Sequence, residues 1–418
     1  MTLGATPLPE YLEYVNKHPE RLRLIETRRV QWDPAVLAGR TLPLLERALL
    51  VPKLHHTGHH PDVSPLVIPR LEELTLTRFY IPFVAPNLRS LFIYSLVPFQ
   101  LEVFVTMLNA LPTLTSLRLD NCLPNILVDG QDVGRIALPR ISNIDLRQST
   151  CTGLITFLEL LRPNGLDISI TLSIGYASKS QAEYAHLAAA LHPFMHGTSR
   201  DTVDLNFEPP DYTPQPSFAV YQSTSNRNSG RTGEISVRVE DCAEDVTPLF
   251  ASLLEQFAIS QIRHLVLLYG ENLDEGMPTH DFRRLLRAPL MFAESLKTVR
   301  YDIRHPLFDQ QHTRSRICTL LFDGRTTYPH LKELILSGSA CLCVLTDQEG
   351  ASKLLSWLKD RRAAGSPLKT LRLRGLFSLY YNSQIEALAE DVVWRSIRAN
   401  VAVVDEWEVL GVNRLSSS

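Results

Sequence analysis

Several features that mark special classes of protein are scarce or missing from this chain. Its six cysteines are too few and too scattered among 418 residues for a disulfide framework. No apolar run approaches the roughly 18–20 residues that a membrane-spanning helix needs. The N-terminus lacks the basic start and apolar core of a secretory signal, and there is no N-glycosylation sequon. The sequence therefore favours a reducing cytoplasmic or nuclear location and predicts no membrane contact.

Charge of one sign and catalytic motifs are also lacking. The formal net charge of −3 provides no long-range attraction for nucleic acid. The chain has no nucleophile elbow, no phosphate-binding loop, no metalloprotease helix motif and no dinucleotide-binding glycine motif. An active site can still assemble from distant positions, and a deep pocket with clustered titratable residues would favour one. We expect a protein that is not an enzyme, needs no cofactor and binds no nucleic acid.

Two groups of metal-ligating residue types stand out, and neither predicts a metal site. The four histidines of His55–His60 could bind zinc or copper as neutral imidazoles. However, Gly58 and Pro61 predict a loop, and Asp62 is the one acidic residue nearby, so a solvated loop is the favoured interpretation. Cys341-Leu-Cys343 is too short for a Cys-x-x-Cys pair and follows a predicted strand, which favours partly buried free thiols.

The chain does contain a repeat, and its best copy is Leu111–Cys122. Apolar residues there follow the spacing that is typical of a leucine-rich repeat. Leu117 and Leu119 are two positions apart and therefore share one face of a strand. A proline precedes the first apolar position by two residues and presets the turn into the strand. Similar units have their first apolar residue at Leu71, Leu88, Ile141, Ile262, Leu296, Leu331 and Leu368.

Segments with helical periodicity lie between these strands. Leu101–Leu111 places its apolar residues on one face. Thr346–Glu349 and Ser383–Glu386 match the capping box that begins a helix. Because strand, turn, helix and strand recur in this order, the sequence predicts an α/β leucine-rich repeat solenoid. We expect a curved, mainly parallel sheet on its concave face and helices on its convex face.

The predicted organisation has five parts. Residues 1–40 form a helical segment or cap, with helices expected at 8–15 and 19–28. Repeats occupy residues 41–207 and 235–410, and residues 411–418 are a tail. Between the two arrays, residues 208–234 are rich in proline and then in small polar residues, which predicts a flexible insertion. One continuous body is the favoured arrangement, and two docked sub-arrays are the alternative.

The repeats, their prolines and the segment Leu42-Pro-Leu-Leu-Glu46 resemble the fungal group of F-box/leucine-rich-repeat proteins, loosely over residues 42–410. The resemblance implies an adaptor whose F-box binds Skp1 of a cullin ubiquitin ligase while the repeats hold a substrate. Leu8-Pro9-Glu10 and Leu12 can be aligned with the start of an F-box. Several of its apolar positions are charged or absent, so the box is degenerate or missing. The asparagine/cysteine position of the repeat is filled as expected only at Cys122.

Side chains opposite the leucines should line the concave face and meet a protein partner there. Two large aromatics lie on this face near arginines, and aromatics with arginine are the usual hot spots of protein interfaces. Either the N-terminal segment or the insertion could instead fold over it. A scaffold unrelated to ubiquitin transfer is the alternative to the adaptor. The candidate contact residues are Phe92, Tyr94, Arg118, Asp120, Asp145, Arg147, Arg300 and Arg372.

Overall fold

The computed structural model describes residues 13, 17–27, 37–51, 58–59, 62–95, 97–125, 134–162, 168–175, 180–195, 200–206, 216–222, 232–240, 247–256, 261–269, 295–303, 322, 328–377 and 391–409. The chain divides into two compact units. The first comprises Met1–Thr198 with Thr232–Val237, and the second comprises Ser199–Arg231 with Arg238–Ser418. Both units are α/β, and most of their strand pairs are parallel, as the repeat pattern predicted.

In the first unit, a sheet is built from one strand per repeat. Its seven parallel strands pair in the order β1 (Leu24–Thr27), β2 (Arg47–Leu50), β5 (Glu73–Thr77), β8 (Ser90–Tyr94), β9 (Ser116–Asp120), β10 (Asn143–Gln148) and β11 (Ser169–Ile174). The next strand in this sheet is β14 (Thr232–Val239). Two small parallel pairs lie beside it, β3 (Gly58–His59) with β6 (Phe79–Tyr80), and β4 (Leu66–Val67) with β7 (Phe83–Val84).

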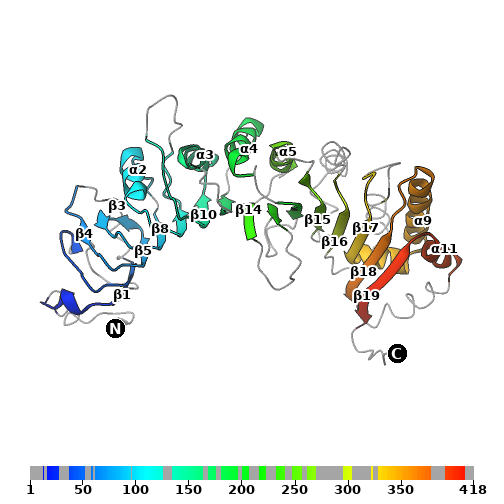
Figure 1. Cartoon of the computed structure of the whole chain (residues 1–418), viewed down its shortest axis with the longest axis horizontal. Helices are drawn as coiled ribbons and strands as arrows, with labels where there is room; N and C mark the ends of the chain where they lie inside the picture. The colour runs from blue at the N-terminus through cyan, green and yellow to red at the C-terminus, as the bar shows by residue number, and fades with distance from the viewer. Residues whose placement is uncertain are drawn as a thin grey trace. The chain divides into compact units, whose positions relative to one another are not determined.

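The core of the first unit lies between the sheet and its helices. In β5, Leu74 and Leu76 are buried while the residues between them are partly exposed, which is the alternation expected of a strand with one covered face. The covering helices are α2 (Leu101–Asn109), α3 (Cys151–Leu160) and α4 (Gln181–Met195), on one face of the sheet (Figure 1). Phe104 of α2 and Phe157 of α3 are fully buried, with ring centroids 6.1 Å apart.

The repeat prolines lie in tight turns that lead into the strands. The amide of Leu71 donates to the carbonyl of Ile68, three residues back, and Leu88 donates to Ala85 in the same way. The proline is the second residue of each turn, where its fixed φ is suited to a type I or type II β-turn. The predicted role of proline is therefore confirmed in these repeats.

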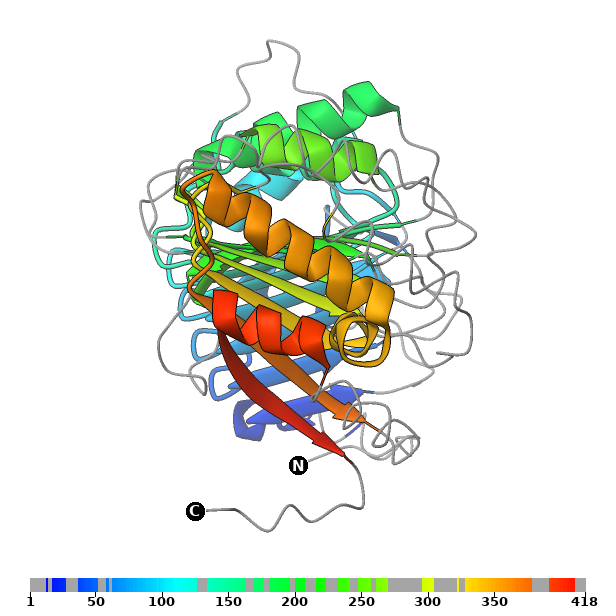
Figure 2. The same cartoon turned by 90° about the vertical axis from the view of Figure 1, so that its right-hand side faces the viewer.

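In the second unit, the strands pair in the order β13 (Ser217–Gln222), β12 (Thr202–Asn206), β15 (His264–Tyr269), β16 (Thr298–Ile303), β17 (Glu333–Gly338), β18 (Thr370–Phe377) and β19 (Ala402–Val409). β12 and β13 are antiparallel and the others are parallel. The described helices of this unit are α5 (Thr247–Gln256), α8 (Ser339–Thr346), α9 (Gln348–Ala363) and α11 (Val392–Asn400). Figure 2 shows α9 and α11 next to each other over β18 and β19. Trp394 of α11 is buried and donates its indole N–H to the carbonyl of Val344.

The expected helix at 19–28 is wrong for most of its length. Pro19–Arg21 forms one 3-10 turn, and Leu24–Thr27 is strand β1, parallel to β2. Ile25 is buried by this pairing, and Leu22 is buried just before the strand. An edge strand that covers apolar surface and completes hydrogen bonds with β2 is favoured over a short isolated helix.

Two further expectations need correction. The insertion expected at 208–234 is not all loop, because Ser217–Gln222 pairs with β12 and buries Phe218 and Val220. Helix α9 is N-capped by Asp347, whose carboxylate accepts from the amide of Glu349, and not by Thr346, which ends α8. The expected capping box Ser383–Glu386 lies outside the described residues. The helix that follows it, α11, is capped by Asp391.

Candidate functional site

The face of the first sheet that its helices leave open carries most of the candidate contact residues. Parallel pairing in register aligns Phe92 of β8, Arg118 of β9 and Asp145 of β10 across three neighbouring strands. Neighbouring strands are roughly 4.8 Å apart, so side chains at matched positions can touch. These three side chains form one row, which we call the aromatic row.

Contacts within the aromatic row join all three side chains. The guanidinium carbon of Arg118 lies over the ring of Phe92, 4.7 Å from its centroid. The Nε of Arg118 is 3.3 Å from a carboxylate oxygen of Asp145. The Arg118 side chain is 47% exposed, so it holds this position with solvent on one side. An exposed cation over an aromatic ring contributes about 0.5–1 kcal/mol, enough to favour one arginine rotamer.

A second row lies two residues further along the same strands and aligns Tyr94, Asp120 and Arg147. Asp120 is only 6% exposed and accepts a hydrogen bond from the side-chain amide of Asn121 at 3.0 Å. Arg147 is 3.9 Å from the same carboxyl group. Burial raises the pKa of Asp120, whereas the charges of Arg147 and Arg118 act to lower it. Asn121 has a φ of 53°, a left-handed conformation that asparagine adopts more readily than most residues.

The candidates of the second unit, Arg300 and Arg372, belong to a separate set of contacts. Arg300 of β16 donates to Asp302 of the same strand at 2.6 Å. Arg372 of β18 bridges Glu333, at 3.1 Å, and Glu406. The hydrogen bond to Glu406 is the main cause of the raised pKa of Arg372. Both arginines form ion pairs with carboxylates of their own unit, so they are less suited to bind a partner than Arg118 is.

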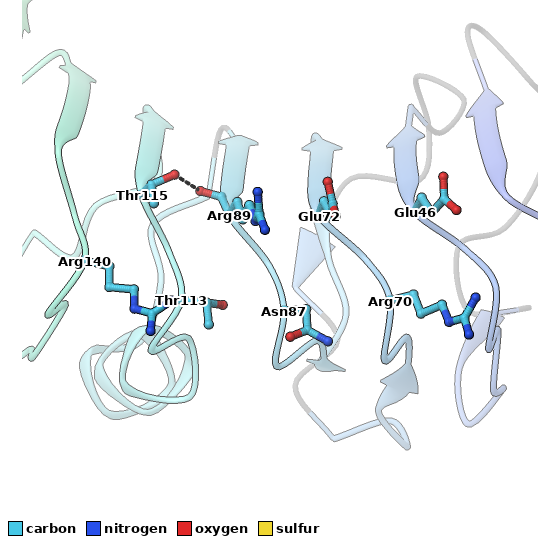
Figure 3. Close-up of a pocket in the computed structure, with 8 residues that line it drawn as sticks. All are labelled: Glu46, Arg70, Glu72, Asn87, Arg89, Thr113, Thr115 and Arg140. Carbon is cyan, nitrogen blue, oxygen red and sulfur yellow. Dashed lines mark hydrogen bonds between the residues drawn. The ribbon is translucent and has the colours of Figure 1, made fainter.

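A groove of about 560 Å³ in the first unit was not predicted from the sequence. It runs along the sheet edge where the strands begin (Figure 3). Its polar side chains form two rows, and the Thr115 hydroxyl donates to the Arg89 carbonyl at 3.0 Å. In the sequence, its residues occupy the two positions that flank the first apolar residue of each repeat. The lining residues are Glu46, Arg70, Glu72, Asn87, Arg89, Thr113, Thr115 and Arg140.

The described residues were searched for side chains grouped as in a metal site or a catalytic site. They contain no group of three His, Cys, Asp or Glu side chains that could hold a metal ion. The groove is open, with Arg70, Glu72 and Arg89 exposed, and it combines both signs of charge. Of the histidine cluster, His55, His56 and His60 lie outside the described residues, and only the backbone of His59 is described. Cys122, Cys151 and Cys341 are buried and form no disulfide.

Neither a protein-family model nor a curated protein matches the chain. The resemblance to F-box/leucine-rich-repeat proteins stays a prediction. No helix in the described part of the chain is both long and apolar enough to span a membrane.

Proposed function

We propose that the protein is a non-enzymatic leucine-rich repeat solenoid that binds another protein through the open strand face of its first unit. The observation that carries the proposal is the aromatic row. Phe92 is half-buried, and Arg118 is held against it and remains 47% exposed on a face that no described helix of the unit covers. A preorganised arginine beside an aromatic ring loses little side-chain entropy when a partner binds.

The solenoid part of the proposal is supported by the backbone between repeats. In the first unit the amides of Glu72 and Glu73 both donate to the carbonyl of Glu46, and those of Arg89 and Ser90 both donate to Glu72. The same forked contact recurs in the second unit, where Lys297 and Thr298 both donate to Arg263. A contact that repeats from each strand to the next is the nearest-neighbour packing of a repeat array.

The binding face can be tested by proximity labelling with the full-length chain. We expect Phe92→Ala/Tyr94→Ala to lose most of the labelled partners of the unmodified protein. Truncation of a hot-spot aromatic weakens binding by about 2 kcal/mol or more. Val84→Ala/Val97→Ala is the matched control, since both valines are more than 40% exposed and lie outside the sheet strands that carry the two rows. An unchanged set of partners for a folded Phe92→Ala/Tyr94→Ala variant would remove this face from the proposal.

We further propose that the protein acts as an F-box-type adaptor that contacts Skp1 through residues 1–40. The part of that segment that can contact Skp1 lies before β1, because Leu24–Thr27 is hydrogen-bonded to β2. Purified full-length protein should then bind purified Skp1, and Leu12→Glu should abolish the complex. Leu3→Glu adds the same charge outside the F-box-like pattern and should leave the complex intact.

The alternative is a scaffold unrelated to ubiquitin transfer, and β1 favours it because the strand takes the place of an expected helix. In that case the protein binds neither Skp1 nor a cullin. Partner labelling through the aromatic row would then survive Leu12→Glu. The two experiments separate the adaptor from the scaffold without depending on the partner's identity.

A further inference from the structure

Four consecutive repeats of the second unit place a basic residue directly before the strand. Arg263 precedes β15, Lys297 precedes β16, Lys332 precedes β17 and Lys369 precedes β18. The amide of each of the three lysines donates to the carbonyl of the basic residue before it in the row, at 2.8–2.9 Å. The four residues are therefore nearest neighbours along one sheet edge, and we call them the basic ladder.

The side chains of the basic ladder are exposed, and the row continues at its β12 end to Asp201, whose carbonyl accepts from the amide of Arg263. All four residues are exposed, and no ion pair joins any of them within the part of the chain that the structure describes. The arginines on the strands nearby behave differently. Arg300 pairs with Asp302, and Arg372 and Arg374 share Glu406.

Four like charges in a row oppose folding. Two unit charges roughly 4.8 Å apart repel by about 0.9 kcal/mol even in bulk water, although long side chains can splay apart. The charges of the ladder act on His264, the first residue of β15, which directly follows Arg263. Burial lowers the pKa of His264, and the positive charges of Arg263 and Lys297 act in the same direction, against Asp201 and Glu333.

The fold does not require cations at these positions. In the first unit the equivalent residues are Glu46, Glu72, Arg89 and Thr115, and each joins the next by the same amide-to-carbonyl hydrogen bond at 2.8–2.9 Å. Acidic, basic and neutral side chains are all compatible with that backbone contact. A row of one sign that the backbone does not need, in a chain of net charge −3, therefore calls for an external counter-charge.

We propose that the basic ladder binds an extended acidic segment of a partner protein. Three intervals between neighbouring strands span about 14 Å, which four or five residues of an extended chain cover. Lysine and arginine stems can reach alternate carboxylates over that length. The proposal goes beyond the strand-face function and does not depend on it, because the ladder and the aromatic row are in different units.

Single-stranded nucleic acid fits the ladder less well. Binding of unpaired bases relies on aromatic side chains that stack on them. The described residues next to the ladder at 261–264, 295–298, 330–333 and 366–370 include no Phe, Tyr or Trp. Glu333, immediately after Lys332, adds a carboxylate that would repel a phosphate chain unless Arg372 engages it fully.

The test uses the full-length protein and a fluorescently labelled octaglutamate peptide, with its anisotropy followed between about 50 and 300 mM salt. We expect salt-sensitive binding that Lys297→Glu/Lys332→Glu weakens at least about tenfold, since each reversed charge acts at close range. Lys359→Glu/Arg395→Glu is the matched control. It makes the same charge change at two exposed residues on helices α9 and α11, and neither of them forms an ion pair within the described residues.

The neutral variant Lys297→Gln/Lys332→Gln should fall between the unmodified protein and the charge reversal. Three outcomes would overturn the proposal: no binding of octaglutamate at the lowest salt, an equal loss in the control variant, or tighter binding of a thymidine oligonucleotide with the same dependence on the ladder. The last would assign the surface to nucleic acid. Thermal unfolding of each variant ensures that any loss comes from charge and not from misfolding.

Discussion

Arg118 lies over the ring of Phe92 on the adjacent strand, with its guanidinium carbon 4.7 Å from the ring centroid. The two residues are 26 positions apart in sequence and are matched by the register of β8 and β9. Asp145 of the next strand holds the other side of the guanidinium. Contacts from two neighbouring strands therefore hold the Arg118 side chain in place on the open face of the first unit.

Arg118→Ala should weaken partner binding and lower the free energy of unfolding only modestly. The cation–π contact and the exposed ion pair to Asp145 together contribute about 1–2 kcal/mol at most. Partner capture should fall about tenfold or more if Arg118 is a hot spot. Lys353→Ala, which breaks the exposed ion pair with Glu349 on α9, is the control. A loss of stability well above that range in urea denaturation would instead make Arg118 a structural residue.

Asp120→Asn should change how stability depends on pH. Burial raises the pKa of Asp120 above its ordinary value of 3.8, so the folded protein binds this proton more tightly than the unfolded chain. Ionisation of Asp120 therefore lowers the free energy of unfolding as the pH rises through the raised pKa. The asparagine variant lacks this effect, so its stability relative to the unmodified protein should improve from about pH 4 to pH 7. Urea denaturation at the two pH values measures it. A relative stability that worsens with pH would mean that the ion pair with Arg147 prevails.

Arg361→Met should destabilise the second unit by about 2–4 kcal/mol, because it leaves two buried carbonyl groups without their donors. Arg361 is 3% exposed, donates to the carbonyls of Tyr328 and Leu331, and lies over the ring of Trp357. Burial lowers the pKa of Arg361 to about 10, so the guanidinium stays charged and the loss should be equal at about pH 6 and pH 8.

The neighbouring Arg362 provides the control for this prediction. It is exposed and donates to the side chain of Asn400. Arg362→Met should therefore cost less than about 1 kcal/mol. Equal effects of the two substitutions in chemical denaturation would show that the buried hydrogen bonds of Arg361 contribute little.

Cys122 and Cys341 should resist alkylation in the folded protein. Burial raises the pKa of both thiols, and the reactive thiolate is therefore rare at neutral pH. Mass spectrometry after iodoacetamide treatment should find both unmodified in buffer and modified in concentrated urea. Rapid modification of Cys122 in buffer would mean that the segment directly after β9 opens locally in the folded protein.

Much of the fold could be predicted from local patterns in the sequence. Alternate leucines after a proline identified the strands at Leu74, Leu91, Leu117 and Ile144, since one residue in two must enter the core. The helix expected at 19–28 was wrong at Leu24–Thr27, which forms strand β1. There the outcome was decided by an unpaired edge of β2, which no local pattern reveals.

For the candidate site, the sequence predicted only which face of the sheet its residues lie on. Strand alternation placed Phe92, Arg118 and Asp145 opposite the leucines, but not next to each other. Whether such residues touch depends on register between strands that lie 26 or 27 residues apart. The groove and the basic ladder were missed for the same reason, because their residues precede the strands and meet only along the sheet edge.

The amino-acid sequence by itself determined the repeated strand, the turn before it and the side that faces the core, because period, proline and apolarity act within a few residues. Tertiary structure alone decided that Arg118 stays exposed beside Phe92 whereas Asp120, two residues later on the same strand, is buried. It also decided that Arg372 is held by two carboxylates whereas Lys332 has none within the described residues. The physical reason is that burial and charge pairing depend on neighbours from other strands, and only the folded register brings those neighbours together.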